Sequence, residues 1–85
     1  MMYKLFIEEM TKNIALFQKH ILENDIISIN RLAHKIKSNF KMFDLEDSLP
    51  LCLKIEKAVS INPAEINLIC SILQEKIDEY KKVFD

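Results

Sequence analysis

The sequence predicts an all-α fold, an antiparallel up-down-up-down four-helix bundle made by a single domain, residues 1–85. Three observations predict this fold. A chain of 85 residues makes one small domain with a modest core. It has no glycine and only two prolines, so it lacks the turn residues on which a β-sandwich depends. Hydrophobic residues make up 49% of the chain, too many for a disordered segment, and they recur at helical spacing.

The first helix is predicted from about residue 2 to residue 23. Its apolar residues recur at alternating spacings of four and three, which places them along one side of a helix. We expect this seam to face the core: Tyr3, Ile7, Met10, Ile14, Phe17 and Ile21. The second helix follows Asn24, is capped by Asp25 and continues to about Met42. Its inward residues are predicted to be Ile29, Leu32, Ile36 and Phe43.

The third helix is predicted to follow Asp44 as its N-cap, with Asp47 at the third helical position and a kink at Pro50 near its start. Its inward face would carry Leu45, Leu49, Cys52, Ile55 and Val59.

The fourth helix has the clearest start signal. Asn62 can cap it, Pro63 suits the first helical position, and Glu65 can complete a capping box. Its inward residues would be Ile66, Ile69, Leu73, Ile77, Tyr80 and Phe84. The short connections between the four segments make successive helices antiparallel.

Two further features limit the class of protein. Cys52 and Cys70 fall among apolar residues, so we expect buried reduced thiols instead of a disulfide or a metal pair. No apolar run approaches the roughly 20 residues that span a bilayer, and the amino terminus lacks the features of a secretory signal. We therefore expect a cytoplasmic protein without membrane contact.

Charge is segregated along the chain. Residues 26–43 carry four basic residues and no acidic ones, whereas the rest of the chain has eight basic and thirteen acidic residues. The second helix should therefore attract an anionic partner or hold an anionic group. Helical geometry places His34 on the side opposite Leu32, Ile36 and Phe43, so its imidazole should be exposed. The same side carries Ile27, Asn30, Arg31, Lys37, Ser38 and Lys41.

Alone, this pattern is most simply a solvated helix face. Nucleic-acid binding would require a broad basic surface or a recognition motif, and we expect none. We also expect no metal site, because His20 and His34 lie on different helices without the ligand spacing that such a site requires.

A longer motif favours a more specific interpretation. Residues 32–38 read LAHKIKS, residues 43–45 read FDL and residues 52–56 read CLKIE. The histidine, the lysine three residues later and the acidic residue on the next helix occur together at the spacing of one family. In this respect the chain resembles the histidine-containing phosphotransfer (Hpt) domain.

The resemblance implies a phosphohistidine carrier in a two-component phosphorelay, which accepts a phosphoryl group on His34 and exchanges it with an aspartate of a receiver domain. It implies that Glu56 orients the imidazole and that Lys37 compensates the phosphoryl charge. The surrounding Ile27, Asn30, Arg31, Ser38 and Lys41 would bind the partner.

Its partners would be receiver domains of response regulators or hybrid histidine kinases. The chain has no glycine with which to build a glycine-rich ATP site, so we expect no kinase activity. We expect no cofactor either, since Mg²⁺ would be bound by the receiver.

The sequence departs from the family pattern at three places, and alternatives therefore stay open. Ser38 stands where the family usually has glycine, Asn39-Phe40 replaces small residues, and Asp44 replaces the glycine between the helices. One alternative is an unphosphorylated adaptor that binds receivers, and another is a structural helical interaction module.

Overall fold

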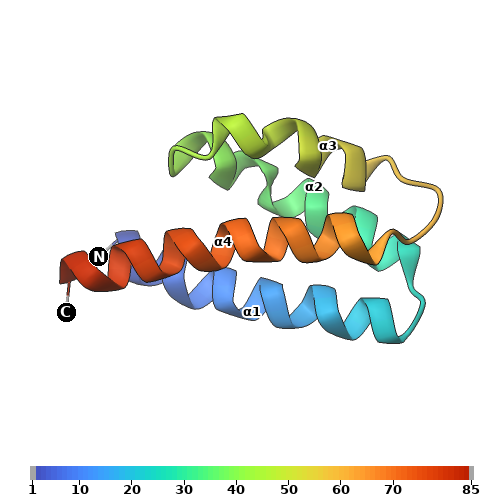
Figure 1. Ribbon diagram of the computed structural model, residues 1–85, viewed down its shortest axis with the longest axis horizontal. Coiled ribbons are helices and arrows are strands. Elements are labelled where there is room, and N and C mark those ends of the chain that lie inside the picture. Colours follow the sequence, from blue (N-terminus) through green and yellow to red (C-terminus); the bar gives the residue numbers. More distant parts are fainter. Residues whose placement is uncertain (1, 85) are drawn as a thin grey trace.

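The computed structural model describes residues 2–84 and shows an all-helical, antiparallel four-helix bundle, as predicted (Figure 1). The helices are α1 (Met2–Leu22), α2 (Ile26–Met42), α3 (Leu49–Glu56) and α4 (Pro63–Phe84), and a short 3₁₀ helix, η1 (Glu46–Ser48), precedes α3. The two long helices α1 and α4 lie side by side, and α2 and α3 form the second pair. Within residues 2–84, no helix is long and apolar enough to cross a bilayer.

The first two connections turn without glycine. Asn24 and Asp44 adopt left-handed backbone conformations, with φ of 54° and 61°. In each turn a backbone amide reaches back to a carbonyl of the helix end, from Asp25 to His20 at 2.9 Å and from Leu45 to Phe40 at 2.8 Å. Asparagine and aspartate tolerate this conformation better than other non-glycine residues, so they end α1 and α2 sharply.

The predicted cap and inward face of α2 are confirmed. The Asp25 carboxylate accepts the backbone N–H of Ser28 at 3.1 Å. The four predicted inward residues, the last of which is the C-cap Phe43, are all buried. Ala33 and Phe40 of α2 are buried as well. The core of the described residues comprises Phe6, Met10, Phe17, Ile29, Leu32, Ala33, Ile36, Phe40, Phe43, Leu45, Cys52, Ile55, Ile66, Ile69, Cys70, Leu73 and Ile77.

The predicted inner face of α1 is partly wrong. Phe6 and Asn13 are buried, whereas Ile7 and Ile14 are only half-buried. Ile21 is half-buried too, and the Tyr3 side chain lies outside the described residues. Three consecutive apolar residues, 5–7, leave the rotation of the helix ambiguous. Asn13 is polar, so an apolar pattern could not identify it.

The predicted start and end of the third helix are wrong. Asp44 lies in the turn, and the N-cap positions of η1 and α3 are Leu45 and Ser48, neither of which makes a side-chain capping bond. Asp47 lies within η1. Pro50 occupies the first turn of α3, where its missing N–H has no helical partner to lose, so it begins the helix instead of kinking it. Val59 is 94% exposed because α3 has already ended.

The fourth helix begins at Pro63, and the predicted cap is confirmed by a hydrogen bond from the Glu65 N–H to Asn62 Oδ1 at 3.3 Å. The capping box is wrong, because the Glu65 carboxylate pairs with Lys54 of α3. The predicted inward residues of α4 from Ile66 to Ile77 are buried and Tyr80 is half-buried, while the Phe84 side chain lies outside the described residues. Cys52 and Cys70 are free and buried, as predicted.

Candidate functional site

His34 lies in the middle of α2 with its side chain 68% exposed. Its neighbours Leu32, Ala33 and Ile36 are buried, because they occupy the opposite side of the helix. The exposure predicted for this imidazole is confirmed. The buried side of α2 therefore packs into the core, while its other side displays a histidine that a partner molecule can reach.

One carboxylate holds both the histidine and a lysine. Glu56, the last residue of α3, places Oε1 2.8 Å from His34 Nδ1. The same oxygen lies 3.0 Å from Lys37 Nζ, one turn beyond His34 on α2. The Glu56 side chain is only 16% exposed. The three side chains thus form a connected group across the α2–α3 pair.

The ionisation of Glu56 determines which nitrogen of His34 carries a proton. Hydrogen bonds from Lys37 and then from His34 hold the pKa of the Glu56 carboxyl below its usual value. An ionised carboxylate only accepts hydrogen bonds, so His34 Nδ1 must carry the proton in this contact. In the neutral imidazole this leaves a lone pair on Nε2. The arrangement can present a nucleophilic nitrogen to solvent.

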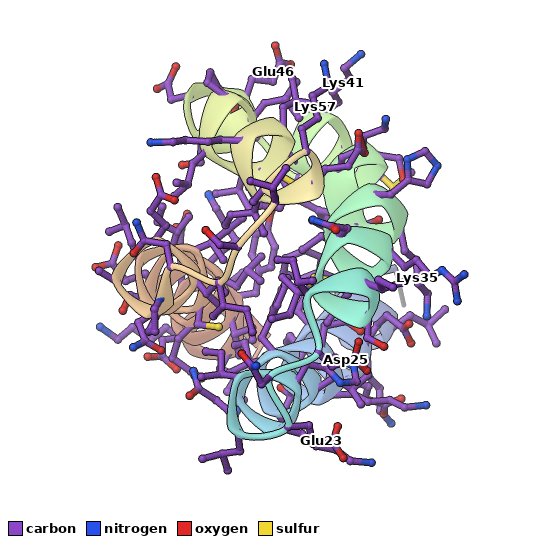
Figure 2. The ribbon with its side chains drawn as sticks, turned by 90° about the vertical axis from the view of Figure 1, so that its right-hand side faces the viewer. Glu23, Asp25, Lys35, Lys41, Glu46 and Lys57 are labelled. Carbon is purple, nitrogen blue, oxygen red and sulfur yellow. The ribbon has the colours of Figure 1, made fainter. Side chains whose placement is uncertain are left out.

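The other residues predicted for the site surround His34 on α2. Ile27, Arg31, Ser38 and Lys41 are exposed. Figure 2, in which Lys35 and Lys41 are labelled, shows both side chains directed away from the bundle interior. Lys35 belongs to the opposite flank, where its Nζ lies 3.3 Å from the Glu9 carboxylate of α1.

Asn30 is the predicted site residue that faces inward toward α3. It is partly buried, and its side-chain amide donates to the backbone carbonyls of Ile55 at 2.8 Å and Ala58 at 3.1 Å. The sequence did not predict these bonds. They depend on how α2 packs against α3, which no local pattern records.

A hollow of about 340 Å³ lies beside Lys37 on the α2–α3 pair. It is lined by Lys37, Ser38, Lys41, Leu49 and Leu53. Leu53 was not predicted as a site residue, because it lies off the apolar seam used to predict the inner face of α3. The hollow combines an apolar floor with two ammonium groups next to the histidine group.

Cys52 lies beneath this site. Its thiol donates to the backbone carbonyl of Ala33 at 3.3 Å, and burial raises its pKa to about 11. The thiol therefore stays protonated at neutral pH and serves packing instead of chemistry.

A second group of possible ligands lies at the α1–α2 turn, where Figure 2 labels Glu23 and Asp25. Ligand atoms of His20, Glu23 and Asp25 lie within 4.8 Å of one another. Both carboxylate oxygens of Asp25 already accept hydrogen bonds from Ser28, at 3.1 Å from the backbone N–H and 2.6 Å from the hydroxyl. We therefore assign the Asp25 carboxylate to helix capping.

The fold and the site define a class of protein, a helical bundle that displays one exposed, carboxylate-bound histidine on a basic helix. The family model of the Hpt domain matches residues 1–82, and the chain belongs to this family. Its function is accordingly histidine phosphotransfer in a phosphorelay, as a phosphotransfer intermediate and not a kinase. Hpt domains exchange phosphoryl groups with receiver domains. No curated protein and no solved structure matches the chain significantly.

Proposed function

We propose that His34 is the phosphoacceptor, with Nε2 as the attacking nitrogen. The observation that carries the proposal is the bond between His34 Nδ1 and Glu56 Oε1, which leaves Nε2 on the exposed side of the ring. His20, the other histidine of the chain, is much less exposed and lies at the end of α1.

In the proposed reaction, the Nε2 lone pair attacks the phosphorus of a receiver aspartyl phosphate. The N–P bond forms, the P–O bond to the aspartyl carboxyl breaks, and the receiver regains its carboxylate. The ring keeps the proton on Nδ1 and gains positive charge, which the Glu56 carboxylate stabilises at 2.8 Å. The reverse sequence passes the phosphoryl group to a second receiver.

Lys37 provides charge for the phosphoryl oxygens in this proposal. Its ammonium group contacts Glu56 and lies one helical turn from His34, so a short side-chain movement brings it to a phosphoryl group on Nε2. Arg31 and Lys41 add a more distant positive field. In this proposal the acidic pocket of the receiver holds the Mg²⁺.

The proposed partners are receiver domains of response regulators or hybrid histidine kinases, which would place the protein in the cytoplasm. They would dock on the exposed residues Ile27, Arg31, Ser38 and Lys41, and Asn30 lies at the edge of this surface. Ser38 places a hydroxymethyl group where the family pattern has glycine. We assign it a role in selecting which receivers fit.

The test is to incubate the protein with a phosphorylated receiver and Mg²⁺, followed by intact-mass analysis at neutral pH, which preserves phosphohistidine. We expect one added phosphoryl group on the wild type and none on His34→Gln, with both proteins equally folded by circular dichroism. Label that persists on His34→Gln would refute the assignment. Receiver binding without any label would support the unphosphorylated adaptor instead.

A further inference from the structure

The C-terminal end of α3 is closed differently from the ends of α1 and α2. The turns that follow those two helices contain Asn24 and Asp44 in left-handed conformations, and within residues 2–84 no other residue has a positive φ. The residue after α3 is Lys57, with φ of −100°, and its N–H points back to carbonyls of α3. The end of α3 therefore has no left-handed residue, and its backbone is held by the bonds from the Lys57 N–H to Leu53 at 3.2 Å and from the Ala58 N–H to Ile55 at 3.3 Å.

A side chain from α2 adds two hydrogen bonds to this end of α3. The Asn30 amide donates one hydrogen bond to the Ile55 carbonyl and one to the Ala58 carbonyl, at 2.8 and 3.1 Å. An asparagine amide has two N–H donors, so both are used here. These two carbonyls belong to residues on either side of Glu56. Asn30 thus holds the backbone segment that carries the carboxylate.

The Asn30 and His34 contacts form adjacent links between the same two helices. The two residues are four apart on α2, so they lie one above the other on one helix face. Asn30 holds the backbone around Glu56, and His34 binds its carboxylate at 2.8 Å. Since α3 has only eight residues, it has little intrinsic ability to keep its last turn in place.

We propose that Asn30 is a positioning residue for phosphotransfer, which closes the end of α3 and thereby keeps Glu56 on His34 Nδ1. The inference rests on the proposed roles of His34 and Glu56. Without the amide, the last turn of α3 frays and the carboxylate moves into solvent. The proton is then no longer held on Nδ1, so part of the histidine population carries it on Nε2 and cannot attack phosphorus.

The test compares Asn30→Ala in the wild-type background and in the Glu56→Ala background. If Asn30 acts through Glu56, Asn30→Ala lowers the transfer rate on the order of tenfold in the first background and leaves it nearly unchanged in the second. Gln18→Ala is the matched control, because it removes an interhelical amide bond of 2.8 Å to Asn67 on the α1–α4 pair. We expect the control to leave the transfer rate unchanged.

A second measurement does not depend on any partner. The ¹⁵N chemical shifts of the His34 ring report which nitrogen carries the proton. We expect the Nδ1–H form in the wild type and in Gln18→Ala, and a mixture of both forms in Asn30→Ala. If Asn30→Ala fails to fold, Asn30→Ser, which keeps one donor, is used in both experiments and should show a smaller change in the same direction.

Two results would overturn the inference: an equal loss of transfer rate in the two backgrounds, or an unchanged Nδ1–H form in Asn30→Ala. Failure of the proposed function gives a different result. If the proposed function is wrong, the wild type takes up no label or His34→Gln keeps its label. The ¹⁵N shifts of the His34 ring still show in that case whether Asn30 positions Glu56.

Discussion

The two histidines of the chain lie in environments that look alike in composition but differ in structure. Each has a glutamate oxygen near Nδ1. His20 lies 3.4 Å from Glu23, three residues later in the chain, and its side chain is 18% exposed. His34 lies 2.8 Å from Glu56 on a different helix, and its side chain is 68% exposed.

The difference shows that a nearby carboxylate does not by itself orient and expose a histidine ring. A contact of 3.4 Å to a half-exposed neighbour is weak and leaves the ring poorly oriented. The His34 pair joins two packed helices, and Lys37 occupies the same carboxylate oxygen at 3.0 Å. Tertiary packing therefore fixes one ring and exposes it, whereas the other ring belongs to a helix end.

The largest expected contrast comes from removing each histidine in turn. His34→Gln should lose all phosphoryl label, whereas His20→Gln should keep labelling within about twofold of the wild type, as expected for a substitution away from the site. Intact mass after incubation with a phosphorylated receiver measures both. A strong loss in His20→Gln, with the fold intact, would contradict the separation of the two histidines.

Removing each glutamate tests whether the carboxylate matters only at His34. Glu56→Ala should lower the transfer rate by about 10- to 100-fold, the usual effect of losing a group that orients a reactive histidine. Glu23→Ala should leave the rate unchanged. A time course of phosphoryl transfer from one receiver gives both rates, and equal rates for the two variants would exclude an orienting role for Glu56.

The lysines of α2 offer a finer comparison within the basic helix. Lys37→Ala should slow transfer and shorten the lifetime of the phosphohistidine severalfold, because the phosphoryl oxygens lose a nearby ammonium group. Lys35→Ala is the control, since its ammonium pairs with Glu9 on the opposite flank. If both variants keep the wild-type rate and lifetime, Lys37 has no part in the reaction.

The smallest expected effect is a loss of folding stability at acidic pH, to which Glu56 beside His34 and Asp25 beside the α1–α2 turn both contribute. Hydrogen bonds from Lys37 and His34 lower the pKa of Glu56 from 4.5, and hydrogen bonds from the Ser28 hydroxyl and backbone lower the pKa of Asp25 from 3.8. A folded-state pKa below the unfolded value means that the stabilisation is fully present above these unfolded values and is lost as pH falls through the folded ones.

Urea unfolding at pH 7 and pH 3 measures this effect. The unfolding midpoint of the wild type should fall on acidification, and Glu56→Gln and Asp25→Asn should each reduce that fall. The same fall in Glu56→Gln as in the wild type would show that the Glu56 contacts add no stability.

Much of the fold follows from the apolar pattern, but that pattern predicts the buried residues of some helices better than those of others. On α2 the predicted inward residues are buried and His34 is exposed as predicted, whereas the burial of Ala33 and Phe40 was not predicted. On α1 the consecutive apolar residues Leu5, Phe6 and Ile7 left the rotation ambiguous, and the predicted inner face was partly wrong. Asn13 is buried with Oδ1 unpartnered, which a rule based on hydrophobic residues cannot anticipate.

The site was predictable as a set of residues but not as an arrangement. The family motif indicated His34, Lys37 and Glu56. That one oxygen of Glu56 contacts both partners depends on the packing of α2 against α3. The end of α3 was predicted too late, at Val59, because the apolar spacing continues beyond Glu56 while the helix does not. The contacts of Asn30 at that end join two helices, so the local sequence does not predict them.

The left-handed Asn24 and Asp44 also affect the unfolded chain. Glycine would adopt these conformations without strain, but it would give the unfolded chain more backbone freedom to lose on folding. With asparagine and aspartate, the turns carry some local strain in the native state and a smaller entropy loss during folding. A bundle without a single glycine therefore makes two left-handed turns at residues that keep the unfolded ensemble more restricted.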